Sequence, residues 1–501
     1  MKRYITISLL LITIALHGQH KYDRQWIFGY GDSIPLGWGL SILDFTQDTI
    51  HAYGYAGDNL IGLSSSGSFI CDTAGQIMLM TNNCRIIDRN LQTVAGSDNL
   101  NPGMTNEYAC QAGSDEYPGF QLSLFLPSFN DSITYLVHRN ADYTSVLNAV
   151  ISDRLYLTTI VKRDTIFEVK SKDILSQDTM LPGRLTAYLH EDGKRWWIYS
   201  NPYNTNIFYE YLIGGETGFE GPYVQSVGDT LYYLDVGIGQ TTFSPDGTKL
   251  ALNNKAKGAM VYDFDKATGM LSNYRHYPYP KMDTLPQGLC FSPDARFIYV
   301  TTPEDVYQID IEDTDSTTSV YHIGHFRSFS ETGWPVGLGY MTVGPDCRIY
   351  VSPGSTTNYI HVIDHPNEKG AACNFIERAI RTPTRVLHFL PNLPMYRTGT
   401  DCDSSLIWGF PTGIAAAFEK EGFRVYPNPT TGVVYVNIPA AASGRWYVTD
   451  ALGNPVSSGI AKGTNTIDID LTAQPSGMYF FYWYANDGSN RVEKIVHIRG
   501  G

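Results

Sequence analysis

The residues best suited to chemistry in this sequence are few, and the most compact group is His190, Glu191 and Asp192. Imidazole and carboxylate groups are the ligands that zinc takes in proteins, so these three residues together could hold a metal ion. They also precede Gly193 and lie between two apolar stretches, where they would form the turn of a β-hairpin. We therefore expect exposed turn residues here, and we predict no metal site.

A second group of acidic residues could bind a cation. Glu304 and Asp305 are followed by Glu312, Asp313 and Asp315. Carboxylate oxygens are the ligands that calcium prefers. The spacing does not match an EF-hand loop, and runs of acidic residues are commonly solvated. We expect a solvated loop here rather than a cation site.

Three tryptophans are candidates for stacking on sugar rings: Trp196, Trp197 and Trp334. A tryptophan exposed at the mouth of a binding surface offers a flat apolar face with a polar edge. The same side chain fills a hydrophobic core at least as well. We expect core packing for each of the three.

Motifs for catalysis are missing from the sequence. A serine hydrolase needs the pattern G-x-S-x-G, and the nearest approach, residues 62–67, has the wrong spacing. The glycine pairs at 237–239 and 337–339 precede expected strands rather than helices, which disfavours dinucleotide binding. Neither H-E-x-x-H nor a P-loop occurs. We predict no catalytic residues and no cofactor, and the ligand-binding residues stay unassigned.

Composition points to an acidic protein rich in strands. The chain has 501 residues, of which 43% are hydrophobic and 13% aromatic, and its formal net charge is −14. This length exceeds what one hydrophobic core usually supports, and aromatic residues favour pleated, half-buried surfaces. Because an acidic surface repels phosphate backbones, we expect no nucleic-acid partner.

The first residues resemble a secretory signal. Met1-Lys2-Arg3 is followed by an apolar stretch over residues 4–16 and then by polar residues. This pattern predicts a signal peptide over residues 1–19, with cleavage near Gly18 and Gln19. The apolar stretch is shorter than the roughly 20 residues that a membrane span requires. No later segment is longer, so we expect no transmembrane segment.

The cysteines number seven, so at least one must be unpaired if the others form disulfides. They are Cys71, Cys84, Cys110, Cys290, Cys347, Cys373 and Cys402. Export would permit disulfides, but the sequence does not indicate the pairing. Cys290 and Cys347 lie in apolar strand patterns, so we expect both to be small core residues.

One local pattern repeats through the middle of the chain: an apolar strand, a turn containing Pro-Asp, and a second apolar strand. The turn aspartates are Asp246, Asp294 and Asp346, which gives periods of 48 and 52 residues. Proline presets the turn, and aspartate can accept a hydrogen bond from the backbone two residues later. Weaker versions of the turn occur at residues 71–75, 130–132 and 190–193.

A period near 50 residues with several strands per unit predicts a β-propeller. We expect an all-β chain with a seven-bladed propeller, six or eight blades being the margin. Strands at 25–29 and 40–45 and a late strand around 386–389 would build one blade from both ends and so close the ring. A pair of two-sheet sandwiches is the alternative, which the regular period disfavours.

The repeated turn resembles the blades of WD-repeat-like and YVTN-type bacterial propellers. Two stretches, residues 71–75 and 390–397, also resemble exported propeller proteins of gliding-type bacteria, as do residues 26–29, 81–86 and 100–103. That group has no assigned activity. Ala295 and Cys347 stand where the turn glycine is usual, so we expect their turns to differ in type from the turn at Gly247.

The end of the chain reads as a separate unit. Periodicity lapses over residues 402–422, which we interpret as a linker after a propeller domain at 22–401. About seven short strands follow within residues 423–501, which predicts a small immunoglobulin-like β-sandwich.

The motifs of this unit resemble the type A C-terminal sorting domain of the type IX secretion system, over residues 423–499. The matching positions, in chain order, are Tyr426, Pro427, Asn428, Pro429, Gly432, Gly453, Gly477, Met478, Tyr479 and Lys494. The resemblance implies a Gram-negative cell, passage through the periplasm, contact with the type IX machinery, and a product that is secreted or held at the outer cell surface.

Two functions fit these observations. The first is a non-enzymatic propeller that binds a glycan, a peptide or a protein partner. The second is a propeller-type hydrolase or lyase that acts on extracellular polysaccharide through residues from distant loops. The missing catalytic motifs favour the first.

Overall fold

The structure is a computed structural model. It describes residues 21–31, 38–55, 60–111, 116–215, 218–236, 239–282, 288–313, 319–330, 332–388, 390–396, 402, 406–408, 424–438, 443–451, 453–462, 466–485 and 490–499. The predicted signal peptide, with Gly18 and Gln19, lies outside these residues. Within them, no helix is both long enough and apolar enough to cross a membrane.

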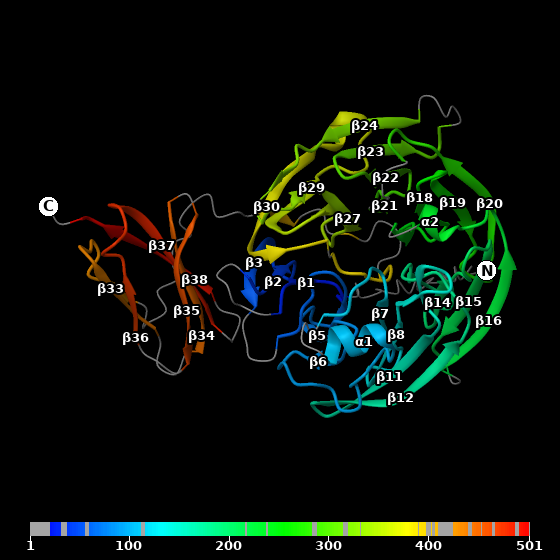
Figure 1. The fold of residues 1–501 in the computed structure, drawn as a ribbon, viewed down its shortest axis with the longest axis horizontal. Helices are drawn as coiled ribbons and strands as arrows, with labels where there is room; N and C mark the ends of the chain where they lie inside the picture. Colours follow the sequence, from blue (N-terminus) through cyan, green and yellow to red (C-terminus); the bar gives the residue numbers. More distant parts are fainter. Residues whose placement is uncertain are drawn as a thin grey trace, which may run out of the picture.

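The larger part of the chain is an all-β, propeller-like ring of sheets (Figure 1). Each sheet is named here after its innermost strand. The β1 sheet contains β1 (Gln25–Gly29), β2 (Leu40–Asp44) and β3 (Thr49–Tyr55). The β4 sheet contains β4 (Ser68–Cys71), β5 (Ile77–Thr81) and β6 (Ile86–Asp88). The β7 sheet contains β7 (Ser123–Pro127), β8 (Ile133–Arg139), β11 (Leu155–Arg163) and β12 (Ile166–Ser176), and the β13 sheet contains β13 (Ala187–Leu189), β14 (Trp196–Ser200), β15 (Ile207–Ile213) and β16 (Phe219–Ser226).

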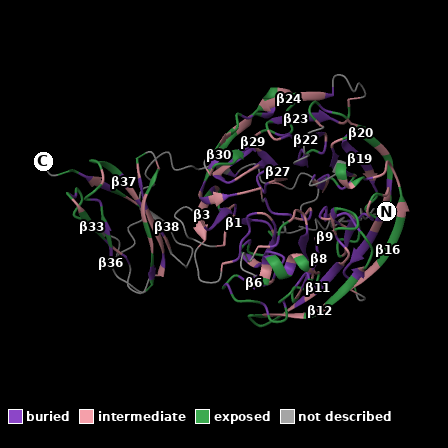
Figure 2. Ribbon diagram, viewed as in Figure 1, coloured by how far each residue is buried: buried purple, intermediate pink, exposed green. Residues whose placement is uncertain are grey.

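Three further sheets repeat the same order of four antiparallel strands. The β17 sheet contains β17 (Thr241–Phe243), β18 (Lys249–Asn254), β19 (Gly258–Phe264) and β20 (Leu271–Tyr277). The β21 sheet contains β21 (Leu289–Phe291), β22 (Phe297–Thr301), β23 (Asp305–Asp310) and β24 (Val320–His325). The β27 sheet contains β27 (Leu338–Val343), β28 (Ile349–Pro353), β29 (Thr357–Ile363) and β30 (Phe375–Val386). The outermost strands follow the rim of the ring and are more exposed than the inner strands (Figure 2).

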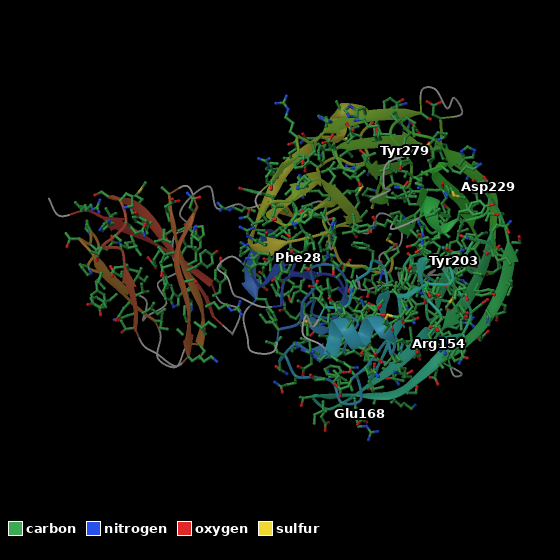
Figure 3. All side chains as sticks on the ribbon, in the orientation of Figure 1. Phe28, Arg154, Glu168, Tyr203, Asp229 and Tyr279 are labelled. Carbon is green, nitrogen blue, oxygen red and sulfur yellow. A yellow bond between two sulfur atoms is a disulfide. The ribbon has the colours of Figure 1, made fainter. Side chains whose placement is uncertain are left out.

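Aromatic side chains fill the space between neighbouring sheets. Trp26 of β1 packs against Phe45 and against Tyr350 of β28, each at 5.0 Å between ring centroids. All three side chains are fully buried, and burying such a side chain removes roughly 150–250 Å² from water. Figure 3 shows the contrast within the ring: Phe28 of β1 points inward, whereas Glu168 of β12 lies at the periphery. These contacts join the first sheet of the chain to the last sheet of the ring.

The repeated Pro-Asp turns have the predicted hydrogen bonds. The carboxylate of each turn aspartate accepts from the backbone N–H two residues later, in the pairs Asp246–Thr248, Asp294–Arg296 and Asp346–Arg348. The prediction that Ala295 and Cys347 change the turn type is wrong, because Gly247, Ala295 and Cys347 have φ values of 69°, 62° and 68°. The hydrogen bonds of the turn therefore hold alanine and cysteine in the left-handed conformation that glycine adopts more easily.

Several short elements are inserted between the strands. They are α1 (Met104–Asn106), η1 (Glu107–Gln111), β9 (Asp142–Thr144), β10 (Ala149–Ile151), α2 (Tyr233–Val236), β25 (Phe329–Ser330), β26 (Pro335–Val336) and η2 (Gly370–Cys373). Connections from an outer strand to the next inner strand contain α1, η1, α2, β25 and β26. The connection between the second and third strands of the β7 sheet contains β9 and β10. Only η2, among these elements, lies between a third and a fourth strand. Because adjacent strands are antiparallel, the first two kinds of connection emerge on the same face of the ring. We call this the insertion face.

The ring is closed by residues from both ends of the domain, as predicted, but with a different late strand. Val386 ends β30, and the closing strand is β31 (Ile407–Trp408), which pairs in parallel with Thr49 and Ile50 of β3. Cys402 forms a disulfide with Cys347. Residues that the sequence analysis assigned to a linker are therefore attached to the ring.

The tail consists of two sheets around one core. One contains β32 (Arg424–Tyr426), β33 (Val433–Asn437) and β36 (Thr466–Asp470), and the other contains β35 (Pro455–Lys462), β34 (Ser443–Asp450), β37 (Gly477–Ala485) and β38 (Asn490–His497). Alternate residues point inward, as strand periodicity requires. Val434 and Val436 of one sheet share the core with Val448, Phe481 and Ile495 of the other.

The turn geometry predicts unequal effects of adding one methyl group at two glycines. Gly193 and Gly247 both have φ 69°, but a Cβ at Gly193 meets nothing within 4 Å, whereas a Cβ at Gly247 would lie 2.3 Å from the ring of Tyr188. We expect Gly193→Ala to lower the free energy of unfolding by about 1 kcal/mol through backbone strain alone. Gly247→Ala should cost about 1–3 kcal/mol more because of the overlap. Urea denaturation of both variants measures the difference, and equal losses would contradict the turn geometry.

Candidate functional site

His190, Glu191 and Asp192 lie in the turn between β13 and β14, as predicted. The backbone N–H groups of Lys194 and Arg195 donate to Asp192, and the Arg195 guanidinium pairs with it at 2.6 Å. Partial burial alone would raise the pKa of Asp192. These hydrogen bonds outweigh the burial and lower the pKa to about 2. His190 Nδ1 accepts from the N–H of Asp192. The polar groups of this turn thus stabilise the hairpin itself.

The acidic residues near 305 do not form one cluster. Asp305 is buried, and its carboxylate accepts from His322 and His325, each at 2.9 Å, and from Lys281 at 2.5 Å. Burial raises its pKa, but these three partners, Lys281 first, lower it to about 2. The expectation of a solvated loop is therefore wrong for Asp305, and it holds for Glu304, which is exposed.

The remaining acidic residues of that group lie apart from Asp305. Glu312 is exposed, with its carboxylate 3.8 Å from Arg296, and Asp313 follows it in the connection after β23. Asp315 lies outside the described residues. The structure therefore does not bring these residues together at one cation site.

Two of the three candidate tryptophans are buried. Trp196 and Trp197 pack in the core on β14 and donate their indole N–H groups to Pro127 O and Lys266 O. Trp334 is 73% exposed, in the connection between β25 and β26. The prediction of core packing is confirmed for the first two and wrong for Trp334.

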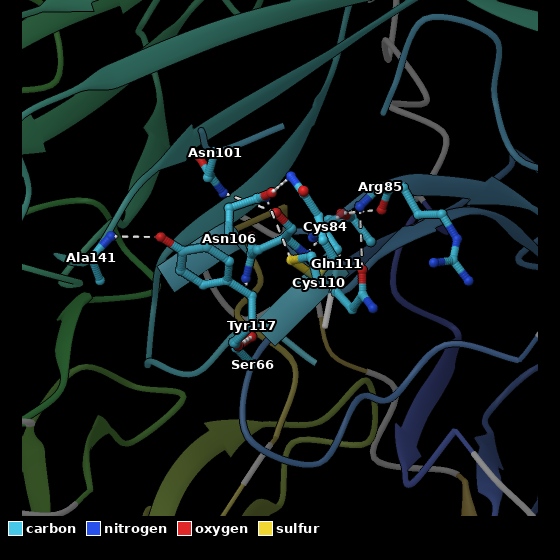
Figure 4. Close-up of a disulfide and its surroundings, with 12 residues drawn as sticks. Ser66, Cys84, Arg85, Asn101, Asn106, Cys110, Gln111, Tyr117 and Ala141 are labelled. Carbon is cyan, nitrogen blue, oxygen red and sulfur yellow. Dashed lines mark hydrogen bonds between the residues drawn. A yellow bond between two sulfur atoms is a disulfide. The ribbon is translucent and has the colours of Figure 1, made fainter. Parts of the chain in front are cut away.

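Two disulfides join parts of the chain that are distant in sequence. Cys84–Cys110 fastens η1 to the turn after β5 (Figure 4), and Cys347–Cys402 fastens the end of the domain to the β27 sheet. Cys71, Cys290 and Cys373 are buried free thiols. Cys290 is a core residue, as predicted. The same prediction is wrong for Cys347, because that cysteine forms a disulfide with Cys402.

The axis of the ring is occupied by the chain itself. Residues Leu390–Tyr396, which we call the strap, lie along the inner strands, with Met395 bridged in parallel to Tyr188 of β13. A cavity beside the strap has a volume of about 50 Å³. Sites for drug-sized ligands are typically about 300–1,000 Å³. This remaining space suits a few water molecules rather than a sugar ring.

Polar side chains bind the strap. The side-chain amide of Asn392 donates to Ser123 O and Leu185 O, both at 3.0 Å, and accepts from Gln121 at 3.1 Å. The hydroxyl of Tyr396 donates to Phe125 O at 2.9 Å. Sequence reasoning noted this segment only as part of a family resemblance. The one available signal was an apolar run interrupted by two prolines, which cannot continue a central strand.

The ten residues that match the sorting motif lie at one end of the tail. Asn428 joins the segment at 426–430 to β38: its side chain donates to Lys494 O at 2.6 Å and accepts from Val496 N–H at 2.8 Å. Gly477 is the first residue of β37. The turn before it is stabilised by the Tyr479 hydroxyl, which donates to Pro475 O at 2.6 Å. Tyr479 also pairs with Asp450 at the start of the turn that contains Gly453.

This end of the tail exposes side chains and backbone to solvent. Tyr426 is 45% exposed and Met478 is 49% exposed. The exposed set also includes Pro427, Asn428, Pro429, Gly477 and Lys494, while Gly432 and Gly453 are half-buried and Tyr479 is buried. The exposed residues therefore form a continuous part of the surface at this end of the tail.

Comparison with known families decides what this end is. Residues 424–498 match the family described as secretion system C-terminal sorting domain. The tail is a sorting domain. It implies secretion through the type IX system, contact with the type IX machinery, and localisation at the cell surface.

Comparison with solved structures adds little for the ring. Aligned structures include a Bacteroides uniformis protein (10% identity, 72% of this chain and 97% of the other, TM-score 0.37) and the Pseudomonas aeruginosa periplasmic gluconolactonase PpgL (12%, 89% and 98%, 0.36). The β-propeller domain of Cps50 (Swd1) from Myceliophteria thermophila also aligns (9%, 66% and 92%, 0.36). TM-scores this low carry no argument about activity. No curated protein matches the sequence.

The two hydrogen bonds of Asn428 predict a local effect of its removal. Asn428→Ala should destabilise the pairing with β38 by about 1–2 kcal/mol, because each bond contributes roughly 1 kcal/mol. Hydrogen exchange of the segment 490–499 should then be about tenfold faster. Met478→Ala removes an exposed side chain at the same end and should leave exchange unchanged. Equal exchange in the two variants would contradict the role of Asn428.

Proposed function

We propose that this protein is a non-enzymatic binding protein of the outer cell surface, exported with its ring folded and its tail as the sorting signal. A signal peptide over residues 1–19 would deliver it to the periplasm. The observation that carries the binding role is the filled axis of the ring, where the strap takes the space that a small substrate would need. Recognition is then left to the outer faces.

The architecture supports a finer description of both parts. We infer a seven-bladed propeller, with the β1, β4, β7, β13, β17, β21 and β27 sheets as blades, and we place the end of this domain at β31 rather than at residue 401. The tail then follows as an immunoglobulin-like sandwich of seven strands. At the sorting end, Gly453 O accepts a hydrogen bond from Arg381 of β30 at 2.9 Å, so this end contacts the ring.

The insertion face is the best candidate for partner binding. Exposed apolar side chains are concentrated on its inserted elements, and Figure 1 shows α1 and α2 lying over the ring interior. These side chains are Met104, Tyr108, Tyr143, Val146, Leu147, Tyr232, Leu234 and Trp334. Thr105 donates to Asp142 and to Ala141 O, at 2.7 Å each, and so joins α1 to β9. Exposed apolar groups on a fixed platform mark interaction surfaces.

The charge of this face is mixed. Glu107 and Asp142 on the inserted elements are acidic, but Lys257 pairs with Asp229 at 3.1 Å and Arg154 pairs with Asp153 at 3.2 Å in connections of the same face. The exposed apolar side chains, rather than a net charge, are therefore what this surface offers to a protein partner.

Removing the tail should separate folding from export. We expect a chain that lacks residues 424–501 to accumulate in the periplasm with both ring disulfides formed, because the ring has its own core and closing strand. Fractionation and protease accessibility of intact cells measure the location, and thiol labelling of the unfolded protein measures the disulfides. Surface display of the truncated chain would overturn the sorting role.

Binding can be tested with the purified mature chain on arrays of glycans and of basic, neutral and acidic peptides. We expect apolar peptides to bind, and Tyr108→Ser with Val146→Ser to weaken binding at least tenfold. Phe129 is also 74% exposed but lies in the β7–β8 turn on the opposite face, so Phe129→Ser is the matched control. Cleavage of an arrayed polysaccharide, or binding that only the Phe129 variant loses, would contradict the proposal.

A further inference from the structure

The strap is bound within the ring much as an extended peptide is bound by a receptor. Its backbone adds to an inner strand, with Met395 N–H donating to Ala187 O at 3.1 Å and a parallel bridge to Tyr188. Such main-chain pairing with pockets for alternate side chains is a general mode of peptide recognition. Leu390 and Tyr396 are buried in two different apolar clusters, each formed between neighbouring sheets.

The ring supplies specific polar partners for one strap side chain. All three hydrogen bonds of the Asn392 amide go to residues of the ring: Gln121, Ser123 and Leu185. Asn392 is only 9% exposed, so an apolar or acidic replacement would leave buried carbonyl groups unpaired. The ring therefore discriminates at this position, as a binding site does.

Connections beyond the strap also hold it in place. Cys402 is bonded to Cys347, Arg348 donates to Leu406 O at 3.1 Å, and β31 pairs with β3. These connections keep the strap at a high effective concentration, of the order of millimolar for short tethers. The free thiol of Cys290, which is 4% exposed, lines the small cavity beside the strap together with Cys402.

We propose that the axis of the ring is a binding site for an extended peptide, and that the strap is its tethered resident ligand. The site recognises a short apolar segment with an asparagine at the position of Asn392 and a tyrosine at the position of Tyr396. A peptide of this kind from outside binds when the resident strap is weakened.

The experiment uses the full chain and a fluorescent peptide with the sequence of Leu390–Tyr396. The variant Cys347→Ser/Cys402→Ser/Asn392→Ala loses the tether and the main polar contacts of the strap but keeps every wall residue that binds Asn392. We expect the peptide to bind this variant by fluorescence anisotropy, and the wild-type chain to show no binding under non-reducing conditions. A control peptide with alanine in place of the asparagine should bind at least tenfold more weakly.

Labelling of Cys290 with a maleimide reports whether the strap has left the axis. Faster labelling that the added peptide suppresses supports the proposal. Faster labelling without peptide binding, up to millimolar peptide, overturns it. Cooperative loss of the near-ultraviolet circular dichroism of the variant also overturns it, because the strap would then be an integral wall of the ring. Asn392→Ala with the disulfide intact keeps the tether, so it should bind the peptide more weakly than the triple variant does.

Discussion

A circle of sheets is stable only if its last sheet packs on its first, and in this protein that junction is made by pieces from both ends of the domain. Trp26 near the start of the domain packs on Tyr350 of the β27 sheet, and β31 completes the β1 sheet by pairing with β3. Closure buries the faces of the first and last sheets against each other, which would otherwise be exposed to solvent. The hydrophobic contacts between sheets depend on this closure.

Closure creates a second constraint at the axis, where the inner strands leave backbone groups without strand partners. Two glutamine side chains provide hydrogen-bond partners for some of these backbone groups. The amide of Gln121 exchanges two hydrogen bonds with the backbone of Thr241, and the amide of Gln240 links Leu289 and Met341. Asn392 and Met395 of the strap donate hydrogen bonds to other backbone carbonyl groups in or next to the inner strands. Buried backbone groups need partners, so the axis is built from side-chain amides as much as from apolar contacts.

Local features could be predicted from the sequence to a large extent, because they depend on a few neighbouring residues. The Pro-Asp turns and their hydrogen bonds follow from residues three or four positions apart. The ten sorting residues also lie together at one end of the tail, where a shared motif order implied a common role. The prediction failed where a contact depends on distant residues: nothing near Ile407 indicates that it pairs with Thr49, and nothing near Cys347 indicates Cys402.

Burial of single residues was predicted less well for the same reason. Trp334 and Trp196 have the same side chain, and only the position of the β25–β26 connection outside the sheets leaves the first exposed. Asp305 looked like part of an acidic loop, yet the fold surrounds it with a lysine and two histidines from other segments. Ala295 and Cys347 adopt a conformation that local preference disfavours, because the turn hydrogen bonds outweigh the strain.

The position of β31 in the sequence affects the order of events during synthesis. β3 forms early, but its partner strand is separated from it by nearly the whole ring and emerges only shortly before the sorting domain. A nascent chain must therefore wait with an unpaired outer edge on its first sheet, and such long-range pairing is slow to form. Because this pairing is slow and the sorting domain follows β31 closely in the sequence, a newly made chain carries its export signal before the ring is closed.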